Sequence, residues 1–225
     1  MTRFQGQDLA CIRGERGVFA GLGFDLAPGA AIVLRGANGS GKTSLLKLMA
    51  GLLPPARGAL TWDQTDLVAD PRAHHGHMHL IGHDDAVKPV LTVRESLTFW
   101  ARIYGGADID RRAVRLALAR FGIEPLADLA CRFLSAGQRR RATLARLVAA
   151  PAPLWLLDEP TTALDDQAVA ALEAVMADHR AGGGMIVAAS HGEIGLRNCR
   201  DLWLDEHPWV SDGTADPLDF AEPAI

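Results

Sequence analysis

Three short, uninterrupted apolar runs stand out along the chain, and each predicts a strand buried on both faces. They cover residues 31–35, 154–157 and 185–189. A segment rich in strong helix formers, residues 44–50, follows the first run. Between the second and third runs, Asp165 can cap a helix whose apolar positions are Val169, Leu172, Val175 and Met176. Because helices and long connections separate these strands, the pattern predicts a parallel sheet and an α/β fold.

The apolar spacing changes between the first and second runs. Residues 58–83 are strand-like and rich in turns. Further on, apolar residues recur at helical intervals, in one segment at Val93, Leu97, Trp100, Ala101 and Tyr104, and in the next at Val114, Leu118 and Phe121. We therefore expect a mostly helical subdomain, at about residues 85–150, inserted into the α/β core.

The chain shows no internal repeat, and we expect one domain over residues 1–204. The remaining segment, residues 205–225, holds six acidic side chains, no Lys or Arg, and the prolines Pro208, Pro217 and Pro223. This composition predicts an acidic, poorly ordered C-terminal tail, with Trp209 and Phe220 as candidate docking points.

Composition narrows the class of protein. Hydrophobic residues make up 48% of the 225 positions and charged residues 22%, which excludes a wholly disordered chain. No apolar run approaches the roughly 18 residues that cross a bilayer, and the first residues lack the apolar stretch of a secretory signal. The cysteines Cys11, Cys131 and Cys199 are far apart and odd in number, which is typical of a reducing cytoplasm.

Charge is distributed unevenly. Residues 85–150 hold 12 of the 23 Lys and Arg but only 6 of the 27 Asp and Glu, so this segment carries +6 and the rest −10. The net charge of −4 excludes a generally basic nucleic-acid binder. The local excess of Arg fits solvated helix faces, or alternatively a surface that faces anionic phosphate or lipid head groups.

A phosphate-binding loop follows the first predicted strand. The pattern G-x-x-x-x-G-K-[ST] is matched in full by Gly36, Ala37, Asn38, Gly39, Ser40, Gly41, Lys42 and Thr43, with Ser44 directly after. Such a loop points backbone N–H groups at phosphate oxygens, and the following helix adds its positive dipole end. Lys42 can reach the β- and γ-phosphates, and the Thr43 hydroxyl can bind Mg²⁺. The motif predicts a nucleoside triphosphate with Mg²⁺ but not how its energy is used.

Two carboxylates end the second predicted strand. Asp158 is suited to hold the Mg²⁺ shell through water, and Glu159 is suited to polarise a water that attacks the γ-phosphate. Because side chains alternate along a strand, the two point differently, as two distinct roles require.

With these motifs, the chain resembles the ATPase domains of ABC transporters over residues 8–204. The segment Leu134–Gln138, with Ser135, Ala136, Gly137 and Gln138, is similar to the family's signature, and Ala163–Asp165 to its D-loop. The resemblance implies a P-loop core with an antiparallel β part, and a head-to-tail dimer in which each ATP lies between one phosphate loop and the other copy's signature. It also implies that His191, directly after the third strand, contacts the γ-phosphate.

Several segments resemble more narrowly the ATPase subunits of cytochrome c maturation systems. They are Leu134–Arg141, Ala145–Leu147, Ile81–Leu97 and the opening Glu15–Leu22. This resemblance implies a peripheral subunit on the cytoplasmic face of the bacterial inner membrane. Its membrane contact would run only through the system's B, C and D subunits. ATP hydrolysis would drive haem export or release of the haem-loaded chaperone.

Two positions depart from the family pattern. Where a glutamine usually contacts Mg²⁺ and the attacking water, this chain has Asp84, and a shift of one residue would select Asp85. No aromatic ring precedes Phe19 at the place where the family stacks one on adenine. Either Arg13 or Arg16 can stack there through its guanidinium plane, whereas Phe19 fits the core better.

Two polar clusters have a structural and a functional interpretation. The histidines His74, His75, His77, His79 and His83 form either a polar, half-exposed segment, which we favour, or a site for zinc, copper or haem. The run Arg139–Arg141 predicts a solvated helix face rather than contact with nucleic acid.

The expected protein is therefore an ABC-type ATPase subunit that drives haem export or release of the haem-loaded chaperone. Three alternatives stay open from the sequence: an ATPase subunit for another substrate, a soluble ABC ATPase without a transport role, and a regulatory nucleotide-binding module with weak hydrolysis.

Overall fold

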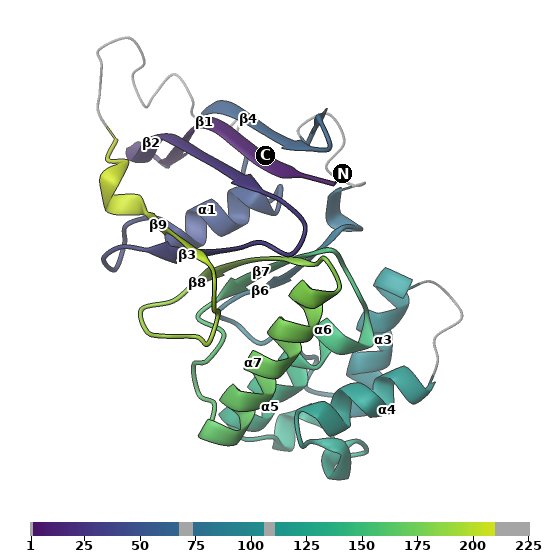
Figure 1. Ribbon diagram of the computed structural model, residues 1–225. Helices are drawn as coiled ribbons and strands as arrows, with labels where there is room; N and C mark the ends of the chain where they lie inside the picture. Colours follow the sequence, from purple (N-terminus) through teal and green to yellow (C-terminus); the bar gives the residue numbers. More distant parts are fainter. Residues whose placement is uncertain (1, 68–73, 106–110, 210–225) are drawn as a thin grey trace.

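Two sheets organise the computed structural model, which describes residues 2–67, 74–105 and 111–209 (Figure 1). The antiparallel sheet has the order β2-β1-β4-β5, formed by Arg16–Leu26, Phe4–Arg13, Arg57–Trp62 and Thr65–Asp66. The parallel sheet has the order β6-β7-β8-β3-β9, formed by Met78–Ile81, Leu154–Asp158, Met185–Ala189, Ala31–Arg35 and Arg200–Trp203. Helix α1, Lys42–Met49, lies between the two sheets (Figure 1). The predicted α/β fold with an antiparallel part is confirmed.

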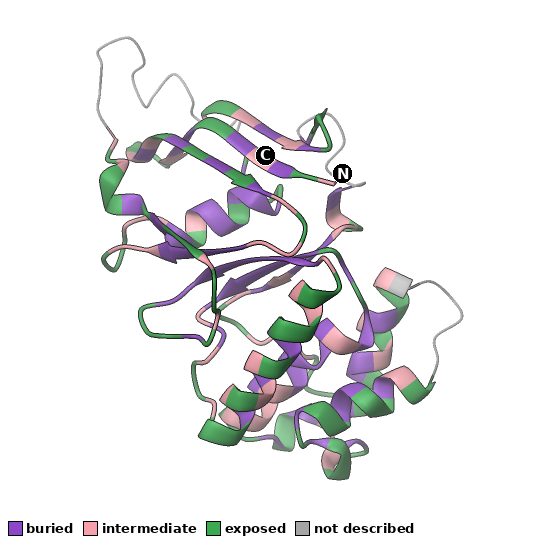
Figure 2. Cartoon of the chain, viewed as in Figure 1, coloured by how far each residue is buried: buried purple, intermediate pink, exposed green. Residues whose placement is uncertain are grey.

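The central strands are buried because both faces of the parallel sheet are covered (Figure 2). In β7, Leu154 and Leu156 pack with α1 and the antiparallel sheet, whereas Trp155 and Leu157 pack with the helices on the other face. This alternation explains why the sequence shows continuous apolar runs there. The three predicted strands agree with β3, β7 and β8 to within one residue.

The helices between β6 and β7 form the expected helical subdomain. They are α3, α4, η1, η2, α5 and α6, with the bounds Val93–Gly105, Arg111–Arg120, Glu124–Leu126, Cys131–Phe133, Ala136–Leu144 and Arg146–Ala149. Helix α7, Asp166–Ala181, covers the same face of the sheet, and the carboxylate of Asp165 caps it by accepting from the Ala168 N–H at 2.8 Å. None of the described helices is long and apolar enough to cross a membrane.

The segment after β9 differs from the expected disordered tail. A 3₁₀ helix, η3, spans Leu204–Glu206, and the His207 carbonyl then accepts a hydrogen bond from the Ala20 N–H at 3.2 Å. The Trp209 indole packs on Gly17, so Trp209 docks as expected. The prediction of a poorly ordered tail was therefore wrong for residues 205–209, because this segment pairs with the edge of β2. Residues 210–225, including Phe220, lie outside the described residues.

Burial of His79 predicts a pH-dependent stability. The ring is fully buried, its Nε2 pairs with the Ala150 carbonyl oxygen, and burial lowers its pKa from 6.5 to about 4. The folded protein needs the neutral ring, so this contribution is complete above pH 6.5 and is lost as the pH falls towards 4. We expect a loss of about 3 kcal/mol in unfolding free energy over this interval, measured by denaturant titration. His79→Asn should flatten the profile; an unchanged slope would contradict this origin.

Candidate functional site

The phosphate loop lies between β3 and α1, and its lysine is folded back onto it. Lys42 is only 8% exposed, and its Nζ donates to the carbonyl oxygens of Gly36 at 2.7 Å and Ala37 at 3.0 Å. Gly41, the N-cap residue of α1, has φ of 105°, and a Cβ there would lie 2.5 Å from Val18 Cγ1. Glycine is therefore required by both backbone conformation and packing. The loop keeps its shape through its own hydrogen bonds.

A single hydrogen bond joins the phosphate loop to the end of β7. The Thr43 hydroxyl donates to Asp158 Oδ2 at 2.8 Å, and Asp158 is 6% exposed. A hydroxyl and a carboxylate at this distance fit Mg²⁺, which prefers oxygen ligands and usually keeps several waters and substrate phosphates in its shell. The structure thus brings together two of the three predicted metal-binding residues.

Glu159 and His191 lie across the same opening. Glu159 directly follows β7 and has φ of 44°, in the left-handed region that non-glycine residues rarely adopt. Its Oε1 is buried without a hydrogen-bond partner and lies 3.7 Å from His191 Nε2, while the His191 side chain is 51% exposed. Arg35 fixes the loop around His191 by donating to the carbonyl oxygens of Ser190 and Gly192. A free carboxylate oxygen beside an exposed imidazole is suited to bind and orient water.

These groups border one cavity of about 490 Å³. Its wall combines part of the phosphate loop and α1, the end of β7, two histidines and the β1–β2 hairpin, namely Asn38, Gly39, Gly41, Lys42, Thr43, Ser44, Asp158, Glu159, His83, His191, Arg13, Arg16, Gly17 and Val18. The predicted loop residues Gly36, Ala37 and Ser40 lie outside this wall. The cavity therefore has a cationic and polar end, built by the phosphate loop, and a second end at the hairpin.

The signature segment does not border this cavity. Ser135 caps α5 in a capping box, in which its Oγ accepts from the Gln138 N–H and the Gln138 side chain accepts from the Ser135 N–H. A Cβ on Gly137 would lie 2.8 Å from the Ala163 carbonyl oxygen, so the signature packs against the D-loop of its own chain. Ser135 and Ala136 are exposed. Each chain thus carries the two halves of the predicted ATP site at separate places.

Asp84 is exposed and does not line the main cavity, whereas its neighbour His83 does. A second, smaller cavity of about 190 Å³ is bordered by Thr43, His83, Asp84 and Asp158. Asp84 therefore shares a smaller cavity with the Thr43–Asp158 pair. The predicted role of Asp84 as a metal-binding residue stays a prediction.

The prediction that Arg139–Arg141 form a solvated helix face was wrong for Arg140, which is 3% exposed. Its guanidinium donates to the carbonyl oxygens of Gly82 at 2.8 Å, Asp158 at 2.9 Å and Glu159 at 2.8 Å, and it lies 3.6 Å from Asp85 Oδ1. Burial lowers the pKa of Arg140, and the carboxylate of Asp85 opposes that shift. One side chain of the signature helix thus ties α5 to the strand end that carries the acidic pair.

Four of the five clustered histidines make contacts within the fold, whereas His83 lines the main cavity. His74 and His75 pair with the Met49 and Ala50 carbonyl oxygens at the end of α1, and His77 stacks on Trp62. Among the described residues, no three His, Cys, Asp or Glu side chains are grouped so that they could share a metal ion. The expectation of a half-exposed segment was wrong for His74 and His79, which are buried.

Among the described residues, those that line the hairpin end of the cavity include no aromatic ring. Phe19 is fully buried in the core, as favoured from the sequence. Arg13 and Arg16 both line the cavity, so either guanidinium can stack on the adenine base. Both side chains are exposed, so exposure does not distinguish between them.

Comparison with known proteins agrees with this site. The family model described as ABC transporter matches residues 19–162. A putative ABC transporter ATP-binding protein from Pyrococcus furiosus has the same fold, with a TM-score of 0.80 over 92% of this chain and 100% of that chain at 22% identity. This chain therefore belongs to the ABC transporter family.

Curated relatives narrow the assignment. The chain is 55% identical over 206 residues to the cytochrome c biogenesis ATP-binding export protein CcmA of Paramagnetospirillum magneticum, covering 91% of this chain and 95% of that protein. It is 56% identical over 204 residues to CcmA of Rhodospirillum rubrum, covering 90% and 85%. It is thus an ATP-hydrolysing ABC protein of the CcmA type, which confirms the resemblance drawn from its motifs.

Replacing Arg140 should weaken both the fold and the site. Arg140→Ala leaves the carbonyl oxygens of Gly82, Asp158 and Glu159 without their donor, so we expect a loss of about 3 kcal/mol in unfolding free energy and reduced ATP turnover. Denaturant titration and phosphate release measure the two effects. Arg115→Ala, at an exposed position of α4, is the matched control and should stay within about 0.5 kcal/mol of the wild type. Equal stability of the two variants would contradict the role of Arg140.

Proposed function

We propose that this chain is the ATP-hydrolysing subunit of an inner-membrane ABC complex for cytochrome c maturation. It couples ATP binding and hydrolysis to haem export or to release of the haem-loaded chaperone. The observation that carries this proposal is the cavity that gathers Lys42, Thr43, Asp158, Glu159 and His191 in a chain 55% identical to a CcmA protein.

The phosphate loop binds the triphosphate. Backbone N–H groups of Gly39, Gly41 and the start of α1 surround the phosphate oxygens, and Lys42 exchanges its two carbonyl partners for the β- and γ-phosphates. The Thr43 hydroxyl and the Asp158 carboxylate would hold Mg²⁺, which would neutralise part of the phosphate charge.

Glu159 positions the attacking water. Glu159 borders the cavity, and its Oε1 has no hydrogen-bond partner, so the carboxylate provides the acceptor for that water. His191 lies 3.7 Å away and stabilises the charge that develops on the γ-phosphate.

A second copy completes the site. Because the signature residues Ser135, Ala136, Gly137 and Gln138 do not border the cavity of their own chain, they are free to cap the nucleotide of a head-to-tail partner. Within each chain, Gly137 of the signature packs against Ala163 of the D-loop, so these two segments are in direct contact. ATP thereby holds the two copies together until it is hydrolysed.

The membrane partners are subunits of the CcmB, CcmC and CcmD type, and the chain is peripheral, on the cytoplasmic face of the inner membrane. The contact surface lies around residues 84–104, where Val90, Phe99 and Ile103 are exposed by 74%, 41% and 56%. Membrane contact runs only through these partners, and nucleic acid takes no part.

Substitution of Glu159 tests the catalytic assignment. Glu159→Gln keeps the size of the side chain but removes the base, so we expect ATP turnover to fall at least about 100-fold while Mg²⁺·ATP now traps a dimer. Phosphate release and size-exclusion chromatography measure the two results. Glu193→Gln, an exposed position two residues beyond His191, should leave both unchanged. Wild-type turnover in the Glu159 variant would contradict the proposal.

Deletion of the gene tests the cellular role. We expect the strain to lose covalent attachment of haem to c-type cytochromes, measured by haem staining, and to regain it with the wild type but not with Glu159→Gln. Co-purification of the membrane subunits identifies the complex. Normal haem attachment in the deletion strain would instead favour a transporter for another substrate.

A further inference from the structure

The segment after β9 passes along the phosphate loop and then along the outer edge of β2, and we name residues 204–209 the C-terminal strap. Its first residue, Leu204, is 2% exposed and lies 3.6 Å from the place that a Cβ of Gly41 would take. The next residue, Asp205, accepts a hydrogen bond from the Ala37 N–H at 3.2 Å through Oδ2. The strap therefore supports the phosphate loop from the side away from the cavity.

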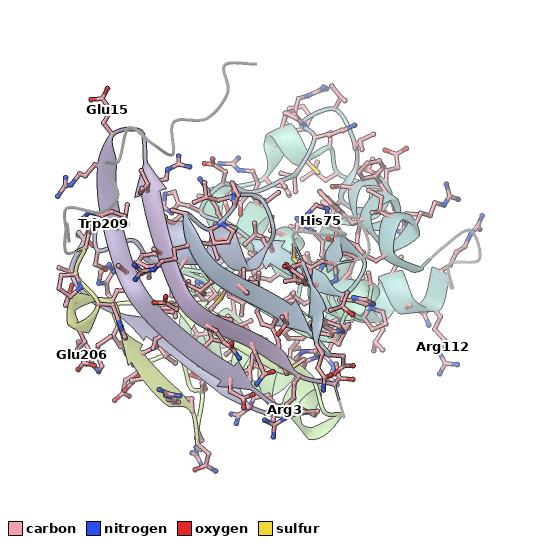
Figure 3. The ribbon with its side chains drawn as sticks, turned by 90° about the horizontal axis from the view of Figure 1, so that it is seen from above. Arg3, Glu15, His75, Arg112, Glu206 and Trp209 are labelled. Carbon is pink, nitrogen blue, oxygen red and sulfur yellow. The ribbon has the colours of Figure 1, made fainter. Side chains whose placement is uncertain are left out.

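The other end of the strap holds the β1–β2 hairpin. The Ala20 N–H donates to the His207 carbonyl oxygen, and Pro208 forms an antiparallel bridge with Phe19. The Trp209 indole comes so close to Gly17 that a Cβ there would lie 2.1 Å from two of its ring atoms. Figure 3 shows Trp209 beside the β1–β2 hairpin, whose tip carries Glu15, and on the same side of the molecule as Glu206.

This edge needs support because β2 is the outermost strand of its sheet. Its inner edge pairs with β1, and the strap pairs with its outer edge at Phe19 and Ala20. Unpaired edge strands are among the less stable parts of a sheet. The first three residues of β2 line the nucleotide cavity; they are Arg16, Gly17 and Val18.

The two ends of the strap thus reach two ends of one cavity. The phosphate loop, Asp158, Glu159 and His191 account for the triphosphate, so the hairpin part of the wall is left for the nucleoside; it consists of Arg13, Arg16, Gly17 and Val18. We propose that Asp205 and Trp209 are positioning residues for nucleotide binding: Asp205 fixes the phosphate loop, and Trp209 fixes the wall that faces the nucleoside. Neither side chain lines the cavity, and each acts through the backbone that it contacts.

The proposal rests on ATP as the substrate. It separates ATP binding into a contribution from the triphosphate, which depends on Asp205, and one from the nucleoside, which depends on Trp209. Trp209→Ala in the full chain should raise KM for ATP roughly tenfold, because the hairpin wall loses its support, with kcat at saturation within about twofold. Inhibition by inorganic tripolyphosphate, which has no nucleoside, should keep its wild-type Ki. Trp209→Phe retains a ring on Gly17 and should restore KM.

Asp205 is tested with a pair of variants. Asp205→Ala removes the acceptor for the Ala37 N–H and should weaken ATP and tripolyphosphate alike, by roughly fivefold. Asp205→Asn keeps an acceptor oxygen without the charge and should bind both at least as tightly as the wild type. Tighter binding by both variants would mean that the carboxylate acts only by repelling phosphate, which would overturn its positioning role.

The matched control is Glu206→Ala, an exposed acidic position of the same strap, which should leave both constants unchanged. If Trp209→Ala does not fold, Gly17→Ala displaces the indole from the other side and should raise KM for ATP in the same way. An unchanged KM in a folded Trp209→Ala protein would overturn the proposal. An equal loss of ATP and tripolyphosphate affinity in that variant would overturn the assignment of Trp209 to the nucleoside wall.

Discussion

The whole site depends on how the end of β7 is held. On one side, the Thr43 hydroxyl binds the Asp158 carboxylate and joins this strand to the phosphate loop. On the other, Arg140 donates to the backbone carbonyl oxygens of Asp158 and Glu159 and joins the strand to the signature helix. A buried guanidinium is costly unless its donors are paired, and here the partners are backbone atoms whose positions follow from the strand itself. The end of β7 is therefore the point at which the nucleotide site and the helical subdomain are joined.

The parts that could be predicted from the sequence are those whose signal is local. The strands β3, β7 and β8 are covered on both faces, so their apolar runs are continuous. The phosphate loop and the acidic pair follow such strands directly, and spacing alone places them at one edge of a parallel sheet. The spacing of apolar residues also indicates the helical subdomain, since it changes there from strand-like to helical.

The parts that were missed depend on contacts between distant segments. Three consecutive arginines look alike in the sequence, and only the position of α5 relative to β7 buries Arg140. His74 is buried because Phe4 and Trp62 pack around its ring from the antiparallel sheet. The ordered start of the acidic tail depends on Gly17, which signals its role only by lacking a side chain. Acidic, proline-containing composition predicts disorder when no docking surface is known, and that surface lies almost 200 residues away along the chain.

The polar groups of the phosphate site are paired with one another. Lys42 is bound to carbonyl oxygens of its own loop, and Thr43 and Asp158 are bound to each other. Binding of a triphosphate therefore exchanges these hydrogen bonds for new ones, and the loop does not have to become ordered at that moment, which lowers the entropic cost of binding. Glu159 Oε1 is the exception, because it is buried and has no hydrogen-bond partner. An unsatisfied acceptor beside the phosphate site favours binding of a water molecule. Water is the reactant that hydrolysis adds to ATP.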